Sequence, residues 1–186
     1  MKKALLALSL ALPLSANAFT ISTADDWSGS INTGWAQSAQ TFLFDNDTTL
    51  NTFGWWLGQA HTHKVSIVQW ANGPAGELYS LNQAWNAGYN EISPNVTFTG
   101  GTLYAVWFDY LGSDLSTVHF NSVDGYEDGE WWLLSGSWSA WSSGNDMRFV
   151  ATFDQDNQNS VPEPTSLALL GLGLAGLGFA RRKMRK

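Results

Sequence analysis

The sequence predicts an all-β fold, an antiparallel two-sheet β-sandwich of jelly-roll type, with an N-terminal signal peptide and one short C-terminal transmembrane helix. Between residues 19 and 153, short alternating runs of apolar and polar residues are bounded by Gly, Asn, Asp and Ser. Helical periodicity is hard to find there. The chain of 186 residues has no cysteine, so an exported domain of this length depends on its apolar core alone.

The N-terminus predicts a secretory signal peptide at residues 1–18. Lys2 and Lys3 precede an apolar run over residues 4–14, and Ala16 and Ala18 fit the small-x-small pattern that signal peptidase cleaves. Because the apolar run is too short to span a bilayer comfortably, we expect cleavage after Ala18 rather than a permanent anchor.

The expected ectodomain covers residues 19–153. We expect strands at residues 40–44, 50–57, 65–69, 102–110 and 147–153. The segment 102–110 is apolar on both faces, which predicts a central strand with one face in the core and the other under a loop or partner. Trp107 is expected to be a core residue.

The C-terminus has three parts after a polar linker at residues 154–160. Pro162-Glu163-Pro164 predicts an exposed, extended stretch. The apolar run of 16 residues at 165–180 would be about 24 Å long as a helix, marginal for a membrane core of roughly 30 Å. The basic cluster that begins with Arg181 and Arg182 should stay on the cytoplasmic side.

These three parts resemble the PEP-CTERM sorting signal, over residues 161–186. The resemblance implies that Pro162, Glu163 and Pro164 are recognised by a membrane-embedded exosortase of a Gram-negative bacterium. It also implies that residues 165–180 are a temporary anchor and that Arg181 and Arg182 stop transfer. The same tail is catalogued as a C-terminal module of ice-binding proteins, and loose motifs such as Ala39-Gln40-Thr41-Phe42 resemble jelly-roll ectodomains found ahead of this signal. The alternative is a permanent C-terminal anchor that needs no protease.

Charge excludes nucleic acid as a partner. Between residues 19 and 160, fifteen Asp and Glu residues face only Lys64 and Arg148, which gives a net charge of −13. Such a domain repels phosphate backbones, because nucleic-acid affinity comes mainly from Lys and Arg.

Tryptophan is the most informative residue type of the ectodomain, which contains all 11 of the chain. One member of each adjacent pair, Trp55-Trp56 and Trp131-Trp132, must leave the core face, because neighbours on a strand point to opposite sides. Exposed rings among polar residues can stack on sugar rings; the alternative is that they cover a sandwich end or pack against loops. The candidate glycan-binding residues are Trp56, Trp131, Trp132, Trp138 and Trp141.

Two segments are candidate metal sites. The acidic, Gly-bearing stretch 124–130 has the oxygen ligands that Ca²⁺ prefers, and its candidate ligands are Asp124, Glu127, Asp128 and Glu130. A solvated acidic loop is the alternative. His61 and His63 would lie on the same side of an extended strand, but zinc needs further ligands and only His119 remains, so we expect a solvated turn there.

No catalytic motif is evident: the chain has no Cys nucleophile, no Gly-x-Ser-x-Gly and no His-Glu-x-x-His. We therefore expect a non-enzymatic exported protein, anchored briefly in the inner membrane and then delivered to the cell surface or extracellular matrix. There it would associate with exopolysaccharide through exposed Trp residues, with no cofactor except possible calcium. The alternatives are an adhesive surface protein that binds other proteins and a secreted polysaccharide hydrolase.

Overall fold

The computed structural model describes residues 17–25, 27, 29–32, 36–110, 117–121, 124–140 and 145–155. The chain divides into two units, and Ala16–Asp156 forms one of them with a core made of its own residues. The other unit lies entirely outside the described residues, and so do the sorting signal and the expected membrane helix at 165–180. Among the described residues, no helix is long and apolar enough to cross a membrane.

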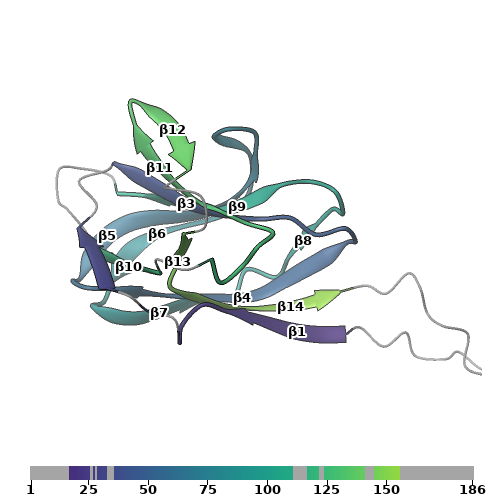
Figure 1. The fold of residues 1–186 in the computed structure, drawn as a ribbon, viewed down its shortest axis with the longest axis horizontal. Coiled ribbons are helices and arrows are strands. Elements are labelled where there is room, and N and C mark those ends of the chain that lie inside the picture. Colours follow the sequence, from purple (N-terminus) through teal and green to yellow (C-terminus); the bar gives the residue numbers. More distant parts are fainter. Residues whose placement is uncertain are drawn as a thin grey trace, which may run out of the picture. The chain divides into compact units, whose positions relative to one another are not determined.

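Antiparallel strands build two sheets that pack as a sandwich (Figure 1). The path of the eight-stranded sheet is β1 (Asn17–Ser22), β14 (Phe149–Gln155), β4 (Thr48–Leu57), β10 (Thr117–Asn121) and β13 (Asp146–Met147), with β2 (Gly29–Asn32) on β10, and β7 (Gly88–Ile92) and β8 (Val96–Phe98) on β4. The order in the six-stranded sheet is β12 (Ser137–Ala140), β11 (Trp131–Ser135), β3 (Gln37–Phe42), β9 (Tyr104–Asp109), β5 (His61–Trp70) and β6 (Pro74–Trp85). The predicted all-β antiparallel sandwich is confirmed.

The ends of the ectodomain meet in one strand pair. Phe19, the expected mature N-terminus, lies opposite Phe153 in the β1–β14 pair, and the two rings stack at 5.3 Å. The exposed Ala18 pairs with Asp154, and β14 continues to Gln155, two residues into the segment expected to be linker. Cleavage after Ala18 would therefore shorten β1 by two residues and leave its aromatic contact intact.

The main core lies between the sheets and is aromatic. Phe42 of β3 contacts Phe53 of β4 and Phe149 of β14 edge-to-face, with ring centroids 6.1 and 5.4 Å apart. Such edge-to-face pairs add stability beyond the area that they bury. These rings face the core because every second side chain of a strand points between the sheets.

Strand β9 has two apolar faces, as the sequence predicts. Val106 and Phe108 point into the main core, whereas Ala105 and Trp107 point to the outer face of the six-stranded sheet. The expectation that Trp107 is a core residue is wrong, because its place in the alternation puts it on the outer face, where it is half-buried.

Candidate functional site

Each adjacent tryptophan pair is divided between the core and the surface. Trp55 and Trp131 are fully buried at 0% exposure, whereas Trp56 and Trp132 point to the outer faces of their sheets and are half-buried. The prediction that one member of each pair leaves the core is thus confirmed. The inclusion of Trp131 among the glycan-binding candidates is wrong, because its ring stacks on Phe120 inside the sandwich.

The outer face of the six-stranded sheet has four packed indoles, the Trp cluster, formed by Trp70, Trp107, Trp132 and Trp138. The Trp70 ring meets Trp138 at 4.8 Å and Trp132 at 5.7 Å, both edge-to-face. The Nε1 atoms of Trp70, Trp107 and Trp132 are buried and have no acceptor among the described residues, so these N–H groups cannot reach a ligand hydroxyl. The arrangement packs the β11–β12 hairpin onto the sheet.

Trp132 and Trp138 are therefore packing residues of this face rather than an open platform. Trp138 also lies against Gly73, where an added Cβ would come within 3.0 Å of its ring. Trp141, the remaining candidate beside them, lies outside the described residues.

Replacing Trp138 by alanine should lower the free energy of unfolding by about 1–3 kcal/mol, less than for a fully buried ring because Trp138 is only half-buried. The loss should appear as a lower urea midpoint. Retention on polysaccharide should stay at the parent level, and a loss of retention without a loss of stability would contradict the packing role.

The outer face of the eight-stranded sheet has a different arrangement, which we call the aromatic row: Tyr89, Trp56, Arg148, Trp27 and His119. Trp56 of β4 and Tyr89 of β7 lie opposite each other, with ring centroids 4.9 Å apart. The Arg148 guanidinium lies 4.2 Å from the Trp56 ring and 4.9 Å from the Trp27 ring. His119 stacks on Trp27 at 4.7 Å, nearly parallel. Residues from five separate segments thus form one continuous set of contacts.

Hydrogen bonds hold the Trp27 end of the aromatic row. Arg148 Nε donates to the Ala24 carbonyl at 3.1 Å, and the Arg148 backbone N–H donates to the His119 carbonyl at 2.9 Å. Trp27 Nε1 donates to the Gly29 carbonyl. Partial burial and the nearby Arg148 charge lower the pKa of His119, which favours its neutral imidazole. Arg148 therefore supplies the positive charge of the row.

A glycine makes room for the Tyr89 end of the aromatic row. A Cβ on Gly54 would come within 2.2 Å of Tyr89 Oη, so only glycine leaves room for this ring over β4. Tyr89 Oη donates to Glu91 Oε2 at 2.5 Å, and burial together with the Glu91 carboxylate raises the pKa of Tyr89 to about 12. The phenol stays protonated and fixed in position.

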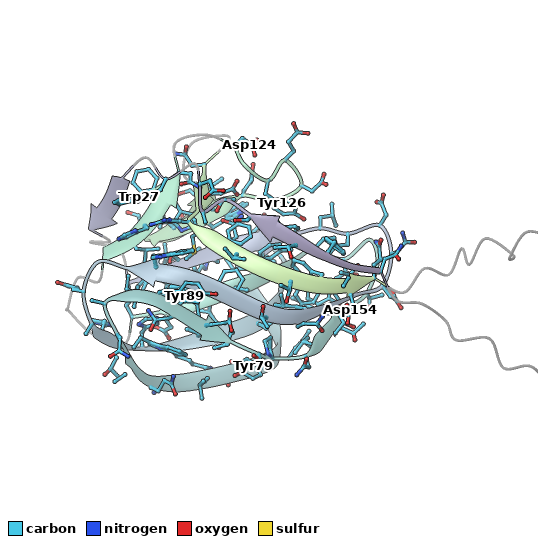
Figure 2. The ribbon with its side chains drawn as sticks, turned by 90° about the horizontal axis from the view of Figure 1, so that it is seen from below. Trp27, Tyr79, Tyr89, Asp124, Tyr126 and Asp154 are labelled. Atoms are coloured by element: carbon cyan, nitrogen blue, oxygen red, sulfur yellow. The ribbon has the colours of Figure 1, made fainter. Side chains whose placement is uncertain are left out.

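Two rings of the aromatic row are open to a ligand. Trp27 is 45% exposed and Tyr89 is 48% exposed, so both present aromatic surface to solvent (Figure 2). A flat ring face packs against the C–H face of a pyranose, and the neighbouring guanidinium can donate hydrogen bonds to sugar hydroxyls. Such a row combines the apolar and polar contacts that a sugar chain needs.

The acidic stretch 124–130 is organised around a buried carboxylate. Asp146 accepts hydrogen bonds from the backbone N–H groups of Gly125 and Tyr126 and from the Gln40 amide, at 2.7–3.0 Å. Burial raises the pKa of Asp146 to about 6 despite these bonds. The expected calcium ligands, Asp124, Glu127, Asp128 and Glu130, are all exposed, and no group of three or more His, Asp or Glu in the described part of the chain could hold a metal ion. They do not converge on a site.

His61 and His63 begin strand β5, so the expected solvated turn is wrong. Their rings do lie on the same side, 5.7 Å apart, but His63 is fully buried beside Tyr110 and Trp85. Burial and the charge that His61 can carry lower the pKa of His63 to about 3. His63 is therefore a neutral core residue.

The comparisons with known proteins divide between the tail and the ectodomain. Residues 160–185 match the PEP-CTERM protein-sorting motif, which confirms the resemblance drawn from Pro162, Glu163 and Pro164. A search of curated proteins finds no match.

Among solved structures, the ectodomain is similar to the cysteine protease and lectin-like domains of Cwp84, a surface layer associated protein of Clostridium difficile. That match has a TM-score of 0.54 and 16% identity and covers 74% of this chain and 36% of the other. A second structure of this clostridial protease, after propeptide cleavage, matches with a TM-score of 0.53 and 16% identity over 75% of this chain and 40% of the other. This chain thus spans well under half of those structures, and the likeness shows the fold alone.

Trp27, Tyr89 and Arg148 are functional candidates that the sequence prediction missed. Trp27 follows two aspartates, and Tyr89 follows Gly88, so each aromatic residue lies among turn-forming residues. An aromatic residue among turn-forming residues could have been predicted to have an exposed ring. Their meeting with Trp56 depends on the pairing of β4 with β7 and β14, which the sequence does not display.

Proposed function

We propose that this chain is a non-enzymatic, exosortase-sorted surface protein whose aromatic row holds neutral polysaccharide. The PEP-CTERM motif implies exosortase processing and a surface location. After release from a transient membrane anchor, the ectodomain would meet the exopolysaccharide around the cell.

One observation carries the glycan proposal: Trp27 and Tyr89, each nearly half exposed, lie in one row of contacts with Trp56 and Arg148. A preformed surface loses little conformational entropy on binding, which favours a weak but specific ligand such as a sugar chain. The lectin-like domain named for the clostridial structure is consistent with such a use of the fold.

Charge selects the class of glycan. The net charge of −13 between residues 19 and 160 repels polyanions over a range of roughly 8 Å at physiological salt. Arg148 is one cation against this field, so neutral chains should bind better than uronate-rich or sulfated chains.

Two observations about candidate catalytic groups support the non-enzymatic part of the proposal. The chain has no cysteine, so the thiol chemistry of the clostridial protease has no counterpart here. His63 is fully buried and faces Trp85 and Tyr110, which leaves it no access to a substrate.

Replacing Trp27 or Tyr89 by alanine should weaken retention on a neutral polysaccharide by about 1–3 kcal/mol each, taking base–aromatic stacking as the nearest measured magnitude. Affinity gel electrophoresis in dissolved polysaccharide gives the dissociation constants. Leu43→Ala is the matched control, because Leu43 is 40% exposed but lies outside the row. An equal loss in the control variant would argue against a specific surface.

Changing Pro162, Glu163 and Pro164 together to alanine should leave the protein in the inner membrane with its tail attached. The apolar run and the basic cluster would still anchor the chain, while the protease would lose its recognition site. Cell fractionation and the intact mass of the protein measure this result. Release of a shortened protein from the variant at the parent level would refute exosortase processing at this triplet.

A further inference from the structure

Strand β6 is an open edge of the six-stranded sheet. Among the described residues it pairs with β5 alone, and it is 12 residues long. Pairing with β5 is unbroken from Tyr79 to Trp85, and the side chains of Ser80, Asn82 and Ala84 in this run are exposed. Because β6 is the last strand of the sheet, the edge of this run that faces away from β5 presents backbone N–H and C=O groups that another strand can pair with.

The usual protections of an edge strand are confined to one end of β6. Pro74 starts the strand, and a β-bulge at Leu78 interrupts the pairing between Glu77 and Tyr79. Beyond the bulge there is no proline, lysine or other charged residue as far as Trp85. Leu78 itself is 45% exposed, so the open run also has apolar surface beside it.

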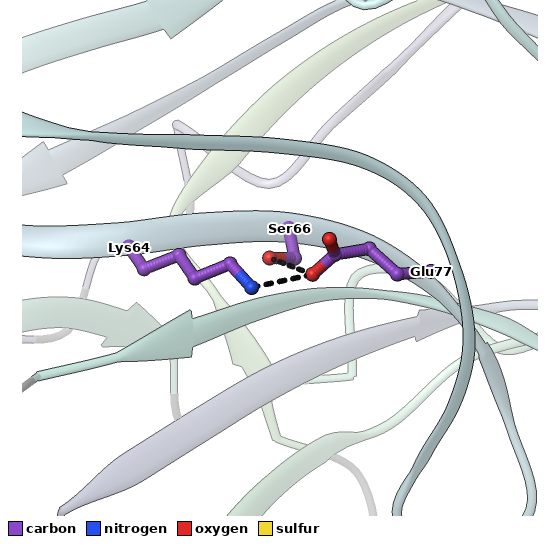
Figure 3. Close-up of polar contacts among 3 residues, drawn as sticks. All are labelled: Lys64, Ser66 and Glu77. Atoms are coloured by element: carbon purple, nitrogen blue, oxygen red, sulfur yellow. Dashed lines mark hydrogen bonds and ion pairs between the residues drawn. The ribbon is translucent and has the colours of Figure 1, made fainter.

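The edge is also electrically neutral in a strongly acidic domain. Glu77 is the one charged residue of β6, and its carboxylate accepts hydrogen bonds from Lys64 Nζ at 2.5 Å and from Ser66 Oγ at 3.1 Å (Figure 3). Lys64 of the neighbouring strand thus neutralises it. Two copies of a domain with a net charge of −13 repel each other, and a neutral edge lets them approach at low electrostatic cost.

We propose that β6 pairs antiparallel with β6 of a second copy, which joins two six-stranded sheets across a two-fold axis. The centre of the unbroken run is Asn82, so Asn82 lies opposite Asn82 of the second copy, and Tyr79 lies opposite its Trp85. Each run supplies the backbone partners that the other lacks, as a self-complementary two-fold interface requires. The two Glu77 side chains then fall beyond the ends of the shared ladder, so no like charges face each other.

The absence of cysteine allows a direct test on the full chain. Asn82→Cys places two thiols opposite each other, with Cβ atoms about 4.5–5.5 Å apart, which a disulfide can bridge after a small adjustment. Under a mild oxidant, most of this variant should run as a linked dimer on a non-reducing gel. Asn46→Cys, an exposed position in the turn before β4, should stay monomeric. Equal linkage in both variants, or none in Asn82→Cys, would overturn the proposal.

A charge variant tests the same interface without a cross-link. Asn82→Asp places two carboxylates opposite each other in the dimer, yet within one copy the new carboxylate lies opposite Lys64, so folding should be kept. In sedimentation equilibrium of the ectodomain unit, the parent should dimerise more strongly as salt screens the repulsion, and Asn82→Asp should weaken dimerisation at least tenfold. Asn46→Asp is the control with the same change in charge. A parent that stays monomeric at high salt, or an Asn82→Asp variant that dimerises like the parent, would contradict pairing through β6.

Discussion

Replacing Trp55 by alanine should lower the free energy of unfolding by about 3–5 kcal/mol, because transfer and cavity terms add when a buried indole is removed. Trp55 is fully buried and packs against Trp85 at 4.9 Å, Phe108 at 5.4 Å and Phe53 at 6.0 Å. A loss of this size is a large share of the stability of an ordinary domain, so much of the variant is expected to be unfolded at 37 °C. Urea unfolding followed by tryptophan fluorescence measures it.

Trp56→Ala is the matched control, since it removes the same side chain from the next position of the same strand. Trp56 lies on the outer face between Tyr89 and Arg148, so we expect a stability loss of about 1 kcal/mol from the lost cation–π and ring contacts. Retention on neutral polysaccharide should fall instead. Equal stability losses in the two variants would contradict this division of the strand between a core face and an outer face, and a larger loss in Trp56→Ala would mean that the strand faces the other way.

Stability should fall steeply in acid because of His63. Its folded-state pKa is about 3, below the ordinary value of 6.5, so between these two pH values the unfolded chain binds more protons than the folded one. The contribution is fully present above pH 6.5 and is lost as the pH falls toward 3. A pKa difference of this size corresponds to roughly 5 kcal/mol of stability across the window. Urea midpoints measured from pH 3 to pH 7 give the slope.

His63→Phe isolates this effect, because it keeps an aromatic ring against Trp85 and Tyr110 but cannot take up a proton. Asp146 acts in the opposite direction, since its raised pKa of about 6 makes stability fall as the pH rises from about 4 to 6. Both proteins retain Asp146, so the difference between their pH profiles belongs to His63. Parallel profiles would show that His63 is not a buried neutral imidazole.

The fold was predictable because its signal is local. Alternation in segments 40–44, 50–57 and 147–153 is visible in the sequence, and the structure places β3, β4 and β14 there. The split of the pair Trp55-Trp56 follows from strand geometry alone. Strand geometry does not show which of the two faces the core. That depends on the register of β4 with its neighbours, and the β4–β14 register shifts between Thr152 and Phe153.

The candidate site was predictable only in part, because its signal is not local. The aromatic row joins five segments between residues 27 and 148, and nothing in the sequence shows that they meet. Strand alternation favoured Trp132 as an exposed ring, and composition favoured Trp138, which lies in a Gly- and Ser-rich segment with few aliphatic residues. The structure buries them partly against Trp70, a contact between strands far apart in the chain. The sorting signal, by contrast, is a contiguous motif and was found complete.

The most direct test of the central claim compares the two outer faces for binding. Retention of the ectodomain on an insoluble neutral polysaccharide should be lost in the double variant Trp27→Ala/Tyr89→Ala and kept in Trp132→Ala, with thermal unfolding confirming that each protein is folded. That result would place binding on the aromatic row of the eight-stranded sheet. A folded double variant retained as well as the parent, or a parent that is not retained on any neutral polysaccharide, would contradict the account.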